Sequence, residues 1–349
     1  MIVKHIHHTV LIAFLILISC TLRAQESNDA GAYLEHIGNQ YTEVSKDLMS
    51  YTSAASHGKG AKKVEKKRQE LIGTMKEAES TVRKMRPFQG DHQLRDSVAS
   101  YFRLSRLVLL EDYGKIVDME DIAEQSYDAM EAYMLAKEKA NDKLEHSYDR
   151  VHEQHSLFAK KNNIRIIESE TKLSQKLESS GKVYNYYNKV YLLFFKSFKD
   201  EAYLMEALAK GDVNAIEQTK SALANSSSAG LGKLNEIGLF NNDATMKNVC
   251  QQFLAFYQQE ATDKATQQVD FFLKKKTFEK MKKAIDAKRQ NDRTQSDIDL
   301  FNKSLNEFNQ SVNKFNSINN ELNKKRSDLI NLWNKTSDSF LSRYVPRYR

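Results

Sequence analysis

A seven-residue repeat of large apolar side chains dominates the C-terminal part of the chain. One core position carries Phe301, Phe308, Phe315, Leu322 and Leu329, and the other carries Leu305, Val312, Asn319, Arg326, Trp333 and Phe340. Alternating steps of four and three residues place both sets on one face of an α-helix, which is typical of a coiled-coil seam. The polar members Asn319 and Arg326 are of the kind that fix helix register at some loss of stability.

Residues that break helices are rare in the whole chain. Its 349 residues include only 12 Gly and 2 Pro. Strands would need runs of β-branched residues between turn signals, and we find none of useful length. The sequence therefore predicts an all-α protein, an elongated antiparallel helical bundle with coiled-coil-like seams.

A short turn occurs twice, from Phe88 to Asp91 and from Phe240 to Asp243, at an offset of 152 residues. An Asp at this place can cap a new helix by accepting hydrogen bonds from its free backbone amides, so Asp91 and Asp243 are predicted N-caps. The Phe can staple the incoming chain to the first turn of that helix. Apolar positions match at the same offset: Tyr51 with Tyr203, Val64 with Ile216, Leu71 with Leu223, Val82 with Leu234, Leu94 with Met246 and Val98 with Cys250.

These matches predict two related halves produced by an internal duplication. We place an export signal at 1–24, the first helical bundle at 25–162, and the second bundle with the heptad helix at 163–349. A further heptad pattern runs from Val98 to Phe158, with Gly114 as its one plausible break. With a break at Gly114 each half is an up-and-down four-helix unit, and without one a very long helix joins the halves. Periodicity alone leaves both open.

The first residues predict export from the cytoplasm. Lys4 and three His precede an apolar run, Thr9 to Ser19, that is too short for a membrane-spanning helix. Leu17 to Cys20 resembles the lipobox of bacterial lipoproteins, in which the Cys is lipidated and becomes the mature N-terminus. Cleavage after Ala24 is the alternative. We favour lipidation of Cys20, because it falls where the apolar run ends, and expect an outer-membrane-associated or cell-surface protein, alternatively a periplasmic or secreted one.

Lipidation of Cys20 and cleavage after Ala24 both leave Cys250 as the only internal thiol. An intrachain disulfide is then excluded even in an oxidising compartment. Because Cys250 matches Val98 of the first half, we predict a small core residue.

The strongest metal-ligand pattern lies on one predicted helix and consists of His146, Asp149, His152, Glu153 and His155. A di-iron bundle would also need Glu-x-x-His pairs on two helices with further inward carboxylates, which are missing. No phosphate loop, nucleophile elbow or zinc spacing occurs either. We therefore assign no catalytic, cofactor or metal residue and predict that the protein is not an enzyme. The alternative is a metal-binding protein or bundle enzyme that uses the face from His146 to His155.

Two surface patterns have more than one interpretation. The formal net charge of +7 is small and dispersed, which is unlike a nucleic-acid binder. Lys274 to Lys276, with Lys282 and Lys283, fit a solvated helix face or contact with anionic lipid or polysaccharide. A line of asparagines beside the C-terminal seam fits solvent exposure, bridging between helices, or a polar ligand such as a glycan. It comprises Asn302, Asn306, Asn309, Asn313, Asn316, Asn320 and Asn323.

Three stretches carry a resemblance to a known family: Asp128 to Ala140, Asp270 to Lys275, and the helix from Phe301. They resemble a family of uncharacterised helical surface lipoproteins of bacteria, over nearly the whole mature chain. The resemblance implies an envelope location and brings no active-site residues. We expect a binding or structural role, a protein or polysaccharide of the envelope as partner, membrane contact through the lipid anchor only, and no nucleic acid.

Overall fold

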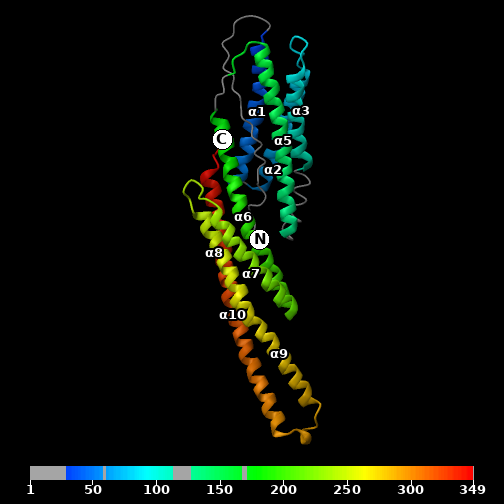
Figure 1. Cartoon of the computed structure of the whole chain (residues 1–349), viewed down its shortest axis with the longest axis vertical. Helices are drawn as coiled ribbons and strands as arrows, with labels where there is room; N and C mark the ends of the chain where they lie inside the picture. The colour runs from blue at the N-terminus through cyan, green and yellow to red at the C-terminus, as the bar shows by residue number, and fades with distance from the viewer. Residues whose placement is uncertain (1–28, 58–59, 113–126, 167–170, 349) are drawn as a thin grey trace. The chain divides into compact units, whose positions relative to one another are not determined.

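The computed structural model describes residues 29–57, 60–112, 127–166 and 171–348 (Figure 1). In these ranges helices joined by short turns make up the chain, and no strand occurs. The helices pack side by side, so the predicted all-α bundle is confirmed. None of the helices described is both long enough and apolar enough to cross a lipid bilayer.

The chain divides into two compact units. The first contains the residues up to Tyr186 together with Ser337–Arg349, and the second contains Tyr187–Thr336. The divide falls inside two helices, α6 (Lys172–Lys210) and α10 (Gln295–Tyr344). The boundary predicted at 162 and 163 falls in the turn that follows α5 (Tyr127–Lys161).

The first unit is built from α1 (Ala30–Ser56), α2 (Ala61–Lys84), α3 (Gln93–Leu107), the π-helical turn η2 (Val108–Asp112), α5 and the start of α6. Asp29 starts α1, because its Oδ1 accepts the Ala32 backbone N–H at 3.0 Å. Helix α1 packs on α2, α2 on α3, and α3 on α5. Tyr41 contributes to the core between the rings of Tyr101 and Phe102.

Helix α5 runs antiparallel to α3. Lys161, at the end of α5, binds Asp91 just before α3 begins, and Tyr148 meets Tyr101 at a ring distance of 6.1 Å. The chain therefore reverses between these helices, and the alternative of one very long helix from Val98 to Phe158 is wrong. Gly114, the predicted break, lies outside the described residues.

The second unit is built from the rest of α6, α7 (Val213–Glu236), α8 (Thr245–Gln259), the π-helical turn η3 (Glu260–Lys264), α9 (Ala265–Asp286), the short 3-10 turn η4 (Gln290–Asp292) and most of α10. Its core is aromatic: Phe194 stacks on Trp333 at 4.0 Å and meets Phe253 edge-on at 4.7 Å. The heptad members Leu322, Leu329 and Trp333 are buried, as a packed seam requires.

Three elements of the first unit recur in the second at the offset of 152 residues. The bounds of α2, α3 and η2 reappear as those of α7, α8 and η3. Both turns pair the same backbone groups, Phe88 with Asp91 and Phe240 with Asp243. A common ancestor of the two halves stays a prediction. Cys250 is fully buried, as expected, and burial raises the pKa of its thiol to about 12, so the thiolate does not form at neutral pH.

Candidate functional site

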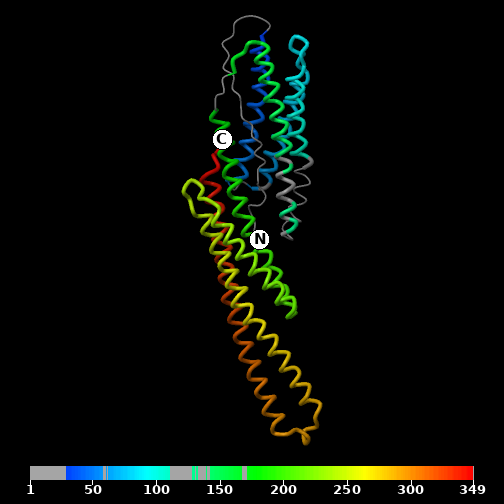
Figure 2. Tube along the Cα trace, viewed as in Figure 1, coloured from blue at the N-terminus to red at the C-terminus, as the bar shows by residue number. Residues whose placement is uncertain are grey.

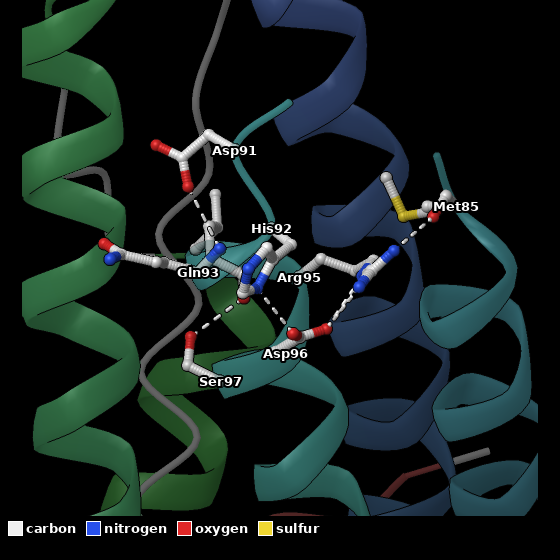
Figure 3. Close-up of polar contacts among 8 residues, drawn as sticks. Met85, Asp91, His92, Gln93, Arg95, Asp96 and Ser97 are labelled. Carbon is white, nitrogen blue, oxygen red and sulfur yellow. Dashed lines mark hydrogen bonds and ion pairs between the residues drawn. The ribbon is translucent and has the colours of Figure 1, made fainter. Parts of the chain in front are cut away.

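The repeated turn is closed by its own backbone and by charged side chains. Figure 3 shows polar contacts of Asp91 and Arg95 at the first copy. Phe88 and Asp91 exchange two backbone hydrogen bonds, of 3.0 and 2.9 Å, around Gln89 and Gly90, which both have positive φ. Asp91 Oδ1 accepts the Gln93 backbone N–H at 3.0 Å. This is the predicted capping bond, made from one residue earlier, because His92 holds the N-cap position.

Basic side chains fasten the same turn. A bond from the Lys161 ammonium lowers the pKa of Asp91, helped by the Gln93 amide. Arg95 Nη1 donates to the carbonyl of Met85 at the end of the preceding helix, at 3.1 Å. In the second unit Lys247 Nζ donates to the carbonyl of Ile237 at 2.6 Å, at the equivalent place. These charged groups are used to close the turns. We therefore assign the turns a structural role, the connection of successive helices.

A buried charged cluster lies in the second unit. Arg326 of α10 donates from Nη2 to Glu260 Oε1 at 2.8 Å, and its Nε binds Glu201 Oε1 of α6. Glu201 is 3% exposed and Glu260, the first residue of η3, is fully buried. One cation thus faces two carboxyl groups in a site from which water is nearly excluded, and one carboxyl group is left without a matching charge.

A proton on Glu260 balances the charges of this cluster. Burial and the neighbouring Glu201 raise the pKa of Glu260, Arg326 lowers it, and the pKa that results is about 8. Glu260 Oε2 has no conventional donor facing it within the described residues. At neutral pH Glu260 is therefore mostly protonated, and its O–H can donate a hydrogen bond to the Glu201 carboxylate.

Glu260 also borders an open pocket of about 370 Å³. The lining includes Gln252, Phe256 and Gln259 of α8, and Lys264, which binds Glu321 of α10 at 2.9 Å. As described, the lining contains no Ser, Cys or His. The cluster of Glu201, Glu260 and Arg326 can hold one proton near neutral pH. It does so where α8 passes through a π-helical turn into α9. Turns of this type often mark functional positions in helices.

The asparagine line on α10 is entirely on the surface. All seven side chains, from Asn302 to Asn323, are exposed. Asn323 Oδ1 accepts from Arg326 Nη1 at 2.6 Å, whereas the side-chain amides of the other six bind no residue in the described part of the chain. The interpretation as bridges between helices therefore does not hold for these six. By contrast, Asn319 in the seam is used inside the fold, because it accepts from Gln268 Nε2 at 2.6 Å.

Helices α9 and α10 continue as a pair beyond the rest of the second unit (Figure 2). The turn between α6 and α7 ends against α9, where a Cβ on Gly211 would lie 3.0 Å from Phe272. Past that point Phe rings pack between the two helices, with Phe278 stacked on Phe308 at 5.1 Å. Because no third helix covers them in the described structure, Phe301 and Phe308 are only half-buried although they occupy heptad core positions.

The end of this α9–α10 hairpin is basic. Residues 274–300 contain nine Lys and Arg against five Asp and Glu. Lys274, Lys288 and Arg289 have carboxylate partners. Five further lysines are exposed and form no ion pair within the described residues: Lys275, Lys276, Lys280, Lys282 and Lys283.

The side chains of the alternative metal-binding face, from His146 to His155, do not converge on one point. His155 is buried, whereas His146, Asp149, His152 and Glu153 are exposed. Burial lowers the pKa of His155, with a further contribution from His152, so its imidazole is neutral in the core. In the described ranges no group of three or more His, Cys, Asp or Glu side chains could hold a metal ion. Cys20, the predicted lipidation site, lies outside the described residues.

Sequence reasoning identified Arg326 as a polar member of the seam but missed both of its partners. Glu201 and Glu260 lie 125 and 66 residues away in the chain, and no local pattern marks them. Comparisons of the chain with protein-family models, with curated proteins and with solved structures find no match.

Proposed function

We propose that this protein is a non-enzymatic, exported binding or structural protein of the cell envelope or cell surface, attached to the membrane through a lipid on Cys20. The attachment rests on the apolar run that ends at Leu17 to Cys20. The binding role rests on one observation, the exposed asparagine line of α10. Its partner is a protein or a polysaccharide of the envelope.

The asparagine line favours a binding role because the fold gains nothing from it. Asn is a poor helix former, by up to roughly 0.7 kcal/mol per residue relative to Ala. Six exposed Asn without partners therefore cost α10 roughly 3 to 4 kcal/mol. Each of them presents one amide donor group and one carbonyl acceptor to the solvent. Regularly spaced donors and acceptors suit an extended, polar partner.

The lipid anchor is tested by feeding cells a palmitate analogue and following the label on the protein. We expect the wild-type protein to take up the label and to fractionate with membranes, and the variant Cys20→Ala to lose both properties. A wild-type protein that carries no label would contradict lipidation, even if it fractionates with the membranes. One found in the cytoplasm would contradict export as well.

The binding role is tested by crosslinking in intact cells, followed by isolation of the protein under denaturing conditions. We expect an envelope protein or polysaccharide to be attached to the wild-type chain. The matched comparison is a variant in which Asn306, Asn309, Asn313 and Asn316 are replaced by Ala. Equal crosslinking of both chains would show that α10 is not the binding element.

A further inference from the structure

We infer that the asparagine line of α10, together with the lysines at the end of the α9–α10 hairpin, binds an acidic polysaccharide. This rests on the binding role proposed above and names the chemical class of the partner. Two independent features of the hairpin carry it, one that selects hydroxyl groups and one that selects negative charge.

The selection of hydroxyl groups follows from the geometry of the line. From Asn302 to Asn323 the steps alternate between four and three residues, so successive amides rise by about 5 Å along one side of the helix. This step is comparable to the length of one sugar ring in an extended polysaccharide. A side-chain amide donates and accepts at once, as a sugar hydroxyl does, so one amide can pair with one ring along the chain.

The selection of negative charge follows from the lysines. Five lysines of α9 are exposed and lack carboxylate partners in the described structure: Lys275, Lys276, Lys280, Lys282 and Lys283. Their charges are therefore available to carboxylate or sulfate groups on a polymer. Lysine suits such a partner because its ammonium is a flexible point charge that demands no fixed pairing geometry.

A lipid surface explains only part of these features. The lysines and the exposed Ile298 and Leu300 near the hairpin end would suit an anionic bilayer. Contact with a bilayer, however, does not explain the row of amides that runs along α10 from Asn302 to Asn323. An acidic polysaccharide uses both the amides and the lysines, so the two features together favour it.

Binding is measured by titrating the purified protein with four probes. They are alginate, which carries hydroxyls and carboxylates, neutral dextran, polyglutamate, and vesicles of phosphatidylglycerol. We expect alginate to bind at least tenfold more tightly than the other three. If polyglutamate binds as tightly as alginate, the lysines alone account for binding and the inference fails. If the vesicles bind more tightly, the partner is a membrane and not a polysaccharide.

Two variants separate the amides from the fold. Asn306→Ala, Asn309→Ala, Asn313→Ala and Asn316→Ala in one chain should weaken alginate binding at least tenfold while raising thermal stability, because Ala is the better helix former. The same four positions changed to Gln keep the amides and should recover most of the binding. Gln310→Ala with Ser317→Ala, two exposed positions outside the line, is the matched control and should bind as wild type.

The lysines are tested by salt. Lys280→Gln, Lys282→Gln and Lys283→Gln in one chain should weaken alginate binding and reduce its dependence on salt concentration. Wild-type binding by either the four-Ala or the three-Gln variant would overturn the inference. If the wild-type protein binds no alginate yet remains lipid-labelled and crosslinks to an envelope protein, the inference fails while the proposed function stands.

Discussion

Glu260 keeps its proton at neutral pH because folding removes it from water beside Glu201. The pKa of Glu260 is raised from 4.5 to about 8, so the folded chain binds a proton that the unfolded chain has released. The stability from this proton is complete below about pH 4.5 and is lost as the pH rises toward 8. We expect the second unit to lose roughly 2 to 4 kcal/mol over this range, measured by urea unfolding at successive pH values.

The variant Glu260→Gln isolates this effect. Gln can still accept from Arg326 and donate to Glu201, but it cannot ionise. The variant should match the wild type at pH 5, exceed it at pH 9, and show a flatter pH profile. A profile as steep as that of the wild type would show that another group carries the pH dependence.

Removing Arg326 tests whether the cluster depends on its cation. Arg326→Met leaves Glu201 buried without a cation beside it, and we expect a loss of about 3 to 5 kcal/mol at pH 7. Adding Glu201→Gln and Glu260→Gln should restore much of the stability, because no buried charge is then left unpaired. Calorimetry of the single and triple variants measures both steps. A triple variant as unstable as the single one would mean that Arg326 acts mainly through packing.

His155 gives the first unit the opposite response to pH. Its pKa is lowered by burial and by His152, so the unfolded chain binds a proton that the folded chain refuses. This unit should lose stability as the pH falls below about 6.5, the ordinary pKa of His. His155→Leu should remove that loss, whereas the exposed His146→Leu should keep it. Amide hydrogen exchange in α5 at pH 5 and pH 7 distinguishes the two variants.

The α6–α7 turn depends on a glycine. Gly211 has a φ of +67°, and a Cβ there would meet the ring of Phe272 at 3.0 Å. Gly211→Ala should therefore destabilise the second unit by about 1 to 2 kcal/mol. Gly232, inside α7 with open space around it, is the matched control, and Gly232→Ala should stabilise by about 0.5 to 1 kcal/mol. Thermal melts of both variants measure the difference, and changes of the same sign would contradict this account.

Local patterns were enough to predict the helices but not their partners. The turn from Phe88 to Asp91 separates α2 from α3 where the sequence indicates, and the heptad from Phe301 forms one helix. Whether the chain reverses after α3 depends on which faces pack together, and periodicity does not record that. Similarly, equal spacing grouped His155 with four neighbouring residues, although its side chain belongs to the core and theirs do not.

The candidate sites also differ in whether local sequence patterns reveal them. The asparagine line is visible in the sequence because it depends on helical spacing alone. The carboxyl pair is not, because Glu201 and Glu260 come from separate helices that meet only in the folded unit. Whether an amide is exposed or engaged is also a tertiary property, as Asn319 and its neighbour Asn320 illustrate.

On the scale of the whole chain, the first unit includes the last residues of the sequence. Ser337–Arg349 belong to it, Val345 is 1% exposed, and the Tyr348 backbone N–H donates to Ser53 Oγ at 3.0 Å. A ribosome therefore makes the whole second unit, Tyr187–Thr336, before it makes this piece of the first unit. Until then α1 lacks one of its neighbours, so the first unit completes its packing only after the second unit has been synthesised.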